Sequence, residues 1–155
     1  MRRTDRAVTD PAAIDAIIRG CGCCRLGLAD GQGVYIVPMS FGFTHEDGLR
    51  TFYFHSAAEG RKIGLLRAGG TVSFELDCGH ALVEGPTACT YSARYSCVMG
   101  TGRVRFLTEP EAQRQALREL MRQNTGSAAW DFPPEALRRL CLFALDVETI
   151  SAKQH

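Results

Sequence analysis

The sequence predicts a mainly β (α+β) fold, in which six antiparallel strands with flanking helices form a single barrel or sandwich. A chain of 155 residues is long enough to bury a core without disulfides or metals. Stretches rich in β-branched and aromatic residues recur along it, separated by glycine-containing turns. Apolar residues at helical spacing are confined to a few segments. We therefore expect one domain over residues 1–155.

The first expected element is a short amphipathic helix. Asp10 is a good helix-capping residue, and Pro11 suits a first helical turn. Three apolar residues then follow at helical spacing, Ile14, Ile17 and Ile18. We expect the helix to end at Gly20.

Six strands are expected after this helix, over residues 23–29, 34–41, 49–55, 72–77, 95–107 and 141–150. Glycine-containing turns at 30–33 and 46–48 separate the first three of them. Pro38 indicates an edge strand or a bulge, because proline cannot donate to a sheet. Gly100 and Gly102 indicate strong coiling or the close approach of another group.

Three further helical segments are expected. The first covers 57–67, and Ser56 with Glu59 has the pattern of a capping box at its start. The second follows a capping box at 108–111 and ends near Gly126. A loop over 130–134 then leads to a helical turn at 135–140.

Composition excludes several classes of protein. Eighteen basic and seventeen acidic residues give a net charge of +1, which argues against a nucleic-acid binder. No apolar run is long enough to cross a membrane, so no membrane association is expected. Seven cysteines are an odd number, which favours free thiols in a reducing compartment. We therefore expect a cytoplasmic protein.

The junction between the third strand and the next helix carries the strongest functional signal. Free amides at a helix start favour an anion, and Arg61 and Lys62 add two cations there. We therefore predict a phosphate site at the helix start over Ser56 to Lys62. The alternative is a solvated basic helix face with an ordinary cap.

A series of short motifs along the chain carries a resemblance to a known family: Met1-Arg2-Arg3, Cys24-Arg25-Leu26-Gly27, Tyr35-Ile36-Val37-Pro38-Met39-Ser40-Phe41-Gly42, Tyr53-Phe54-His55-Ser56-Ala57, Glu59-Gly60-Arg61-Lys62, Tyr91-Ser92, Tyr95-Ser96, Gly100-Thr101-Gly102, Thr125-Gly126 and His155. Over nearly its whole length the sequence resembles the nitroimidazole-resistance flavoproteins. They belong to the pyridoxamine-phosphate-oxidase-like FMN-binding split β-barrels.

The resemblance implies an FMN-binding split β-barrel that forms a homodimer with flavin at the interface. It implies that Arg61 and Lys62 bind the FMN phosphate. Residues lining or flanking the flavin would be Val37, Pro38, Met39, Ser40, Phe41, Phe54, His55 and Ser56. Ser40 stands where the family often has asparagine, so its contact with the ring is an open question.

Two ring-bearing residues are candidates with alternatives. His55 is the candidate catalytic residue, because imidazole changes charge near neutral pH; otherwise it is a strand-end histidine with satisfied hydrogen bonds. Trp130 could cover the flavin of the partner subunit, or it could pack in the core.

The cysteines and glycines do not match known ligand motifs well. Cys21, Cys23 and Cys24 lack the C-x-x-C spacing of a zinc site. Cys78 and His80 have only one residue between them, which does not match a zinc motif either. No metal is therefore expected, and most cysteines are interpreted as small apolar residues. The Gly100-Thr101-Gly102 motif lies inside a strand, which disfavours a dinucleotide site.

Three functions remain open. The leading hypothesis is an FMN-dependent reductase of small aromatic acceptors such as nitroimidazoles, whose electron donor is a reduced nicotinamide or a partner reductase. The second is a non-catalytic flavin- or haem-binding protein. The third is a pyridoxamine-phosphate-oxidase-like enzyme, which is disfavoured because no second basic cluster is present for its substrate.

Overall fold

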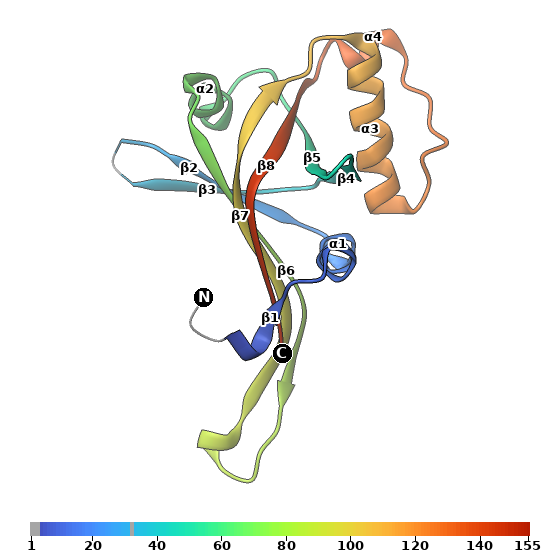
Figure 1. Cartoon of the computed structure of the whole chain (residues 1–155). Coiled ribbons are helices and arrows are strands. Elements are labelled where there is room, and N and C mark those ends of the chain that lie inside the picture. Colours follow the sequence, from blue (N-terminus) through green and yellow to red (C-terminus); the bar gives the residue numbers. More distant parts are fainter. Residues whose placement is uncertain (1–3, 32) are drawn as a thin grey trace.

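A computed structural model describes residues 4–31 and 33–155 (Figure 1). Its helical elements are η1 (Thr4–Arg6), α1 (Pro11–Gly20), α2 (Arg61–Ala68), η2 (Ala88–Thr90), α3 (Pro110–Thr125) and α4 (Pro134–Leu137). Its strands are β1 (Ala7–Val8), β2 (Cys24–Ala29), β3 (Val34–Met39), β4 (Gly42–Glu46), β5 (Leu49–Ser56), β6 (Thr71–Val83), β7 (Ser92–Phe106) and β8 (Cys141–Gln154).

The strands form one antiparallel sheet in the order β3-β2-β6-β7-β8-β5-β4, with β1 added to β8. Its two edge strands, β3 and β4, do not pair with each other, so the sheet is an open, split barrel with flanking helices. This confirms the predicted fold class, although the described residues form eight strands in place of six. The additional strands are β1 and β4. The predicted strand 34–41 ends at Met39, because the chain crosses at residues 40–41 from edge strand β3 to β4 at the opposite edge of the sheet.

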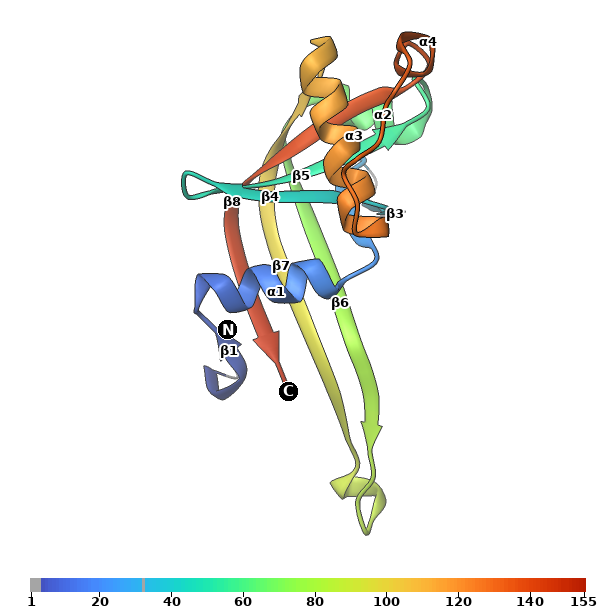
Figure 2. The ribbon, with the colours of Figure 1, turned by 90° about the vertical axis from the view of Figure 1, so that its right-hand side faces the viewer.

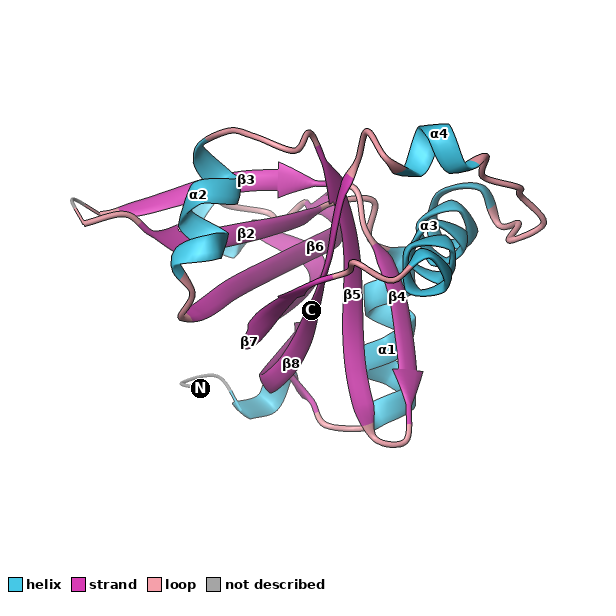
Figure 3. Ribbon diagram, turned by 90° about the horizontal axis from the view of Figure 1, so that it is seen from above, coloured by secondary structure: helices cyan, strands magenta, loops and turns pink. Residues whose placement is uncertain are grey.

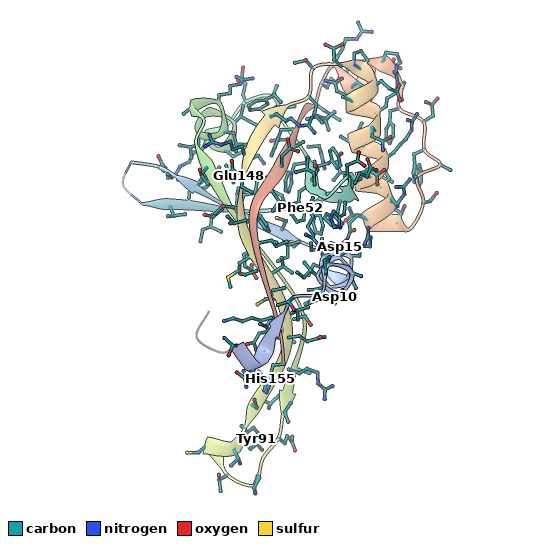
Figure 4. The ribbon with its side chains drawn as sticks, viewed as in Figure 1. Asp10, Asp15, Phe52, Tyr91, Glu148 and His155 are labelled. Carbon is teal, nitrogen blue, oxygen red and sulfur yellow. The ribbon has the colours of Figure 1, made fainter. Side chains whose placement is uncertain are left out.

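Phenylalanine side chains fill the inside of the curved sheet. The ring of Phe52 lies 5.6 Å from that of Phe41, 5.4 Å from Phe43 and 5.0 Å from Phe74 (Figure 4). A smaller cluster on the other face of β5 and β8 packs against α3. Seen from above, α2 lies over β2 and β3, whereas α1 and α3 flank β4 and β5 (Figure 3). None of the helices in the described ranges is long and apolar enough to cross a membrane.

Strands β6 and β7 continue beyond the rest of the sheet as a two-stranded ribbon (Figure 2). The predicted strands at 72–77 and 95–107 did not include this extension. Residues 79–84 of the ribbon are all exposed, so no buried face imposes an alternating pattern on the sequence. Exposed Tyr91 lies near its tip (Figure 4).

Several local signals are confirmed. The Asp10 side chain accepts a hydrogen bond from Ala13 N at 2.9 Å, as a helix cap does. Asp47 and Gly48 have φ values of 50° and 78° between β4 and β5, as a tight hairpin turn requires. Pro38 lies on edge strand β3, where proline is tolerated. The capping box predicted at 108–111 is wrong, because α3 begins without a side-chain cap.

A buried carboxylate joins helix α1 to the β4–β5 hairpin. Asp15 lies on α1, facing that hairpin (Figure 4), and one of its oxygens is 2.6 Å from His45 Nδ1. Its other oxygen accepts a hydrogen bond from Arg50 Nε at 2.7 Å, and Arg50 also donates to the Pro11 carbonyl at 3.1 Å. No role was expected for His45, and the structure makes it a link between helix and sheet.

The glycines of β7 allow the strand to lie unusually close to β8. A Cβ atom at Gly100 would overlap the Thr149 carbonyl oxygen and would lie 2.5 Å from the Phe74 ring. At Gly102 it would overlap the Asp146 carbonyl. The register between the two strands shifts at this point, which is typical of a β-bulge. This confirms the prediction of coiling and close approach.

We predict that Gly100→Ala lowers the free energy of unfolding by about 3 kcal/mol, because backbone atoms of β8 must move to admit the methyl group. Urea denaturation of the purified chain measures this loss. Gly22→Ala is the matched control, since nothing lies within 4 Å of a Cβ there. Equal stability of the two variants would contradict the proposed close contact.

Candidate functional site

The start of α2 differs from the predicted capping box. The helix begins at Arg61, and its N-cap is Gly60, which has a φ of 128° and offers no side-chain cap. This backbone conformation favours glycine and separates residues 57–60 from the helix, so Ser56 and Glu59 do not cap it. The first amides of α2 therefore donate no hydrogen bond to a capping side chain.

Ser56 ends β5 with a buried hydroxyl group. Its residue is only 6% exposed, and its Oγ has no hydrogen-bond partner among the described residues. A buried polar atom without a partner destabilises a fold, so such an atom is commonly matched by a bound group. Ser56 and Phe54 lie on the same, inward face of β5, because strand residues alternate.

The two predicted cations lie in different surroundings. Lys62 Nζ lies 3.6 Å from the Met39 sulfur, and no carboxylate in the described part of the chain pairs with it. Arg61 forms an ion pair with Asp30, donating through Nε at 2.9 Å, and its guanidinium lies 4.5 Å from the centre of the Tyr35 ring. Lys62 is therefore the cation left without an acid partner.

These groups suit a phosphate chemically. Uncapped helix amides, a hydroxyl donor and an ammonium group are the donors with which proteins bind phosphate. Lys62 and the α2 amides would hold the phosphate of a flavin cofactor, and Arg61 would add charge beside them.

The structure separates the other predicted flavin-binding residues into two groups. Four side chains are buried in the main core, those of Val37, Met39, Phe41 and Phe54. The exposed group consists of Pro38, Ser40 and His55. Only the exposed side chains are free to contact a ring bound outside the sheet.

His55 lies on the opposite face of β5 from its two predicted neighbours, Phe54 and Ser56. It pairs across the sheet with Leu142 and is exposed. No hydrogen bond joins its imidazole to any described residue. The expectation that all three residues flank one ligand therefore requires a ligand that reaches both faces at the end of β5.

Trp130 is 46% exposed, so it is not a core residue in this chain. Its loop, residues 126–133, runs along α3 on the side of the molecule away from α2 (Figure 1). Within one chain it is remote from the predicted phosphate site. The opening motif, Met1-Arg2-Arg3, lies outside the described residues.

Every cysteine is a free thiol. Cys21 and Cys24 are buried core residues, four cysteines are partly buried and Cys89 is exposed, so the interpretation of most cysteines as buried apolar residues holds for two of the seven. Burial raises the pKa of Cys21 to about 12, assisted by its hydrogen bond with Cys78, and burial also raises the pKa of Cys24. The buried thiols therefore stay protonated at neutral pH.

The structure has an apolar groove of about 480 Å³ that was not predicted from the sequence. Val34 and Ile36 on β3 are 68% and 63% exposed, and they line it together with Met99 of β7. Arg25 and Glu75 border the groove. The signal was present, because residues 34–37 are apolar on both faces of an edge strand.

A family model described as pyridoxamine 5'-phosphate oxidase matches residues 10–154. A Bacteroides thetaiotaomicron protein assigned to 5-nitroimidazole antibiotic resistance is 32% identical, with a TM-score of 0.82; the alignment covers 96% of this chain and 86% of that one. No curated protein matches the sequence.

Two flavoproteins share the fold at low identity. A flavocytochrome from Azotobacter vinelandii is 16% identical with a TM-score of 0.81, over 100% of this chain and 72% of that one. An FAD- and haem-binding protein from Mycobacterium smegmatis is 16% identical with a TM-score of 0.82, over 96% and 73%. Because the family model spans nearly the whole chain, this protein belongs to the pyridoxamine 5'-phosphate oxidase family, and within it resembles a nitroimidazole-resistance protein.

Proposed function

We propose that this protein is an FMN-dependent reductase of small aromatic acceptors such as nitroimidazoles, and that it acts in the cytoplasm as a homodimer. The observation that carries the proposal is the uncapped start of α2, where Lys62 has no carboxylate partner among the described residues. Similarity to the Bacteroides protein at 32% identity supports the choice of acceptor.

Each residue then has a separate task. Bound FMN would supply the electron transfer, with a reduced nicotinamide or a partner reductase as donor. Lys62 and the α2 amides would hold the phosphate, and Pro38 and Ser40, which are exposed, would contact the ring. Exposed His55 is the group available to donate a proton to the acceptor. Trp130 would cover the flavin of the partner subunit.

The phosphate site is tested by removing its cations. We predict that the double variant Arg61→Ala, Lys62→Ala weakens FMN binding by about 2 to 4 kcal/mol, because hydrogen bonds to charged groups are worth about 1.5 to 3 kcal/mol each. Riboflavin, which lacks the phosphate, should bind almost as well as to the wild type. Quenching of flavin fluorescence gives both affinities.

Two further variants sharpen this test. Arg139→Ala removes an exposed arginine after α4 and should leave FMN affinity unchanged. Ser56→Ala should weaken FMN binding without lowering the stability of the flavin-free chain, since its hydroxyl has no partner there. Undiminished FMN binding by the double variant would place the phosphate elsewhere. Retention of haem in place of flavin would favour the non-catalytic alternative.

His55→Ala is expected to keep FMN bound but to slow reduction of a nitroaromatic acceptor about 100-fold, the contribution of a typical general acid. The rate is measured with flavin-saturated protein, so that a change in FMN affinity cannot account for the loss. His80→Ala is the control, as that histidine is exposed on β6 and bonded to Asp77. A full rate from the His55 variant would exclude the catalytic role.

The homodimer is supported by the exposed apolar groove on β2, β3, β6 and β7, since a two-fold partner is a common way to cover such a surface. We predict that the flavin-loaded chain sediments as a dimer and that Val34→Lys shifts it toward the monomer. Leu49→Lys, on the exposed start of β5, should remain dimeric. Sedimentation of the wild type at monomer mass would contradict the proposal.

A further inference from the structure

A second hollow lies near the other end of α2. It has a volume of about 520 Å³, within the range of small-molecule sites. The last turn of α2 borders it through Arg67, the end of β7 through Phe106, the start of β8 through Cys141 and the first turn of α3 through Gln113. It contains none of the residues assigned above to the FMN phosphate.

One cation dominates the walls of this hollow. The Arg67 guanidinium lies 5.8 Å from the centre of the Phe106 ring, and no carboxylate of the described residues pairs with it. The Gln113 amide already donates to the Leu107 carbonyl at 2.9 Å. Burial raises the pKa of the Cys141 thiol, which therefore stays neutral and leaves the positive charge of Arg67 uncompensated.

Apart from Thr108, the remaining lining is apolar, and aromatic rings of the core lie behind it. Phe106 packs against Phe143 at 6.1 Å, and Phe143 in turn stacks on Phe54 at 5.2 Å. Leu140 and Leu142 complete the apolar wall. An apolar, aromatic wall beside a guanidinium suits a flat aromatic anion, whose ring packs on the wall while its charge meets the cation.

We infer that this hollow binds a small aromatic carboxylate, with its ring against Phe106 and its carboxylate on Arg67. The charge selects the anion, because Arg67 has no acid of its own and a guanidinium pairs with a carboxylate in fork geometry. The apolar walls select the ring. The hollow adjoins the end of β5, since Cys141 and Leu142 pair with Ser56 and His55, but it shares no lining residue with the phosphate site, and we expect both ligands to bind at once.

The probe is 2-naphthoate, titrated by its fluorescence against the purified full chain with and without saturating FMN. 2-Naphthamide, which has the same rings and no charge, is the matched ligand. Arg67→Gln should weaken 2-naphthoate binding about tenfold or more and leave 2-naphthamide unaffected, while Arg67→Lys retains part of the affinity. Arg94→Gln, an exposed arginine on β7, should bind as the wild type does.

A variant that fills the hollow gives an independent measurement. Ala58 is an exposed loop residue on its rim, so Ala58→Leu should fold normally and exclude both naphthalene ligands. Saturable binding that survives FMN but is lost in the Arg67 and Ala58 variants supports the inference. Displacement by FMN, equal affinity of Arg67→Gln, or the absence of saturable binding would each overturn it.

Discussion

The close approach of β7 and β8 at Gly100 and Gly102 is the constraint on which the rest of the sheet depends. Side chains at these positions would meet carbonyl oxygens of β8, so the two strands reach this distance only with glycine. The register shift beside them bends the pair, since a bulge increases local twist. A sheet coiled in this way encloses the phenylalanine core yet leaves edges β3 and β4 unjoined.

Helix α2 lies over this open barrel. A cationic side chain stands at each end of the helix, and the two cations have different surroundings. At its start the amides are uncapped, and Lys62 has a thioether as its neighbour. At its far end Arg67 stands over an aromatic ring beside an apolar hollow. A phosphate suits the first end and a flat carboxylate the second. Two buried residues, Ile63 and Leu66, anchor the helix in the core between these ends.

Sequence reasoning was most accurate where a local rule acts alone. The Asp10 cap, the hairpin turn at residues 47–48 and the edge position of Pro38 each follow from the chemistry of one or two residues. Both predicted capping boxes are wrong. The backbone conformation of Gly60 sets the start of α2, and α3 starts at Pro110, directly after Glu109. Sequence reasoning also missed the β6–β7 ribbon, which has no buried face to create a pattern.

The sequence by itself determined the mainly β class, the order of the elements and the clustering of cations near residue 60, because periodicity and turn chemistry are local properties. Only the tertiary structure decided that Asp30 pairs with Arg61 while Lys62 has no acid partner in the described residues. It also decided that Ser56 is orphaned inside and His55 exposed outside. Partnership and burial arise when distant segments meet, and no spacing along the chain records them.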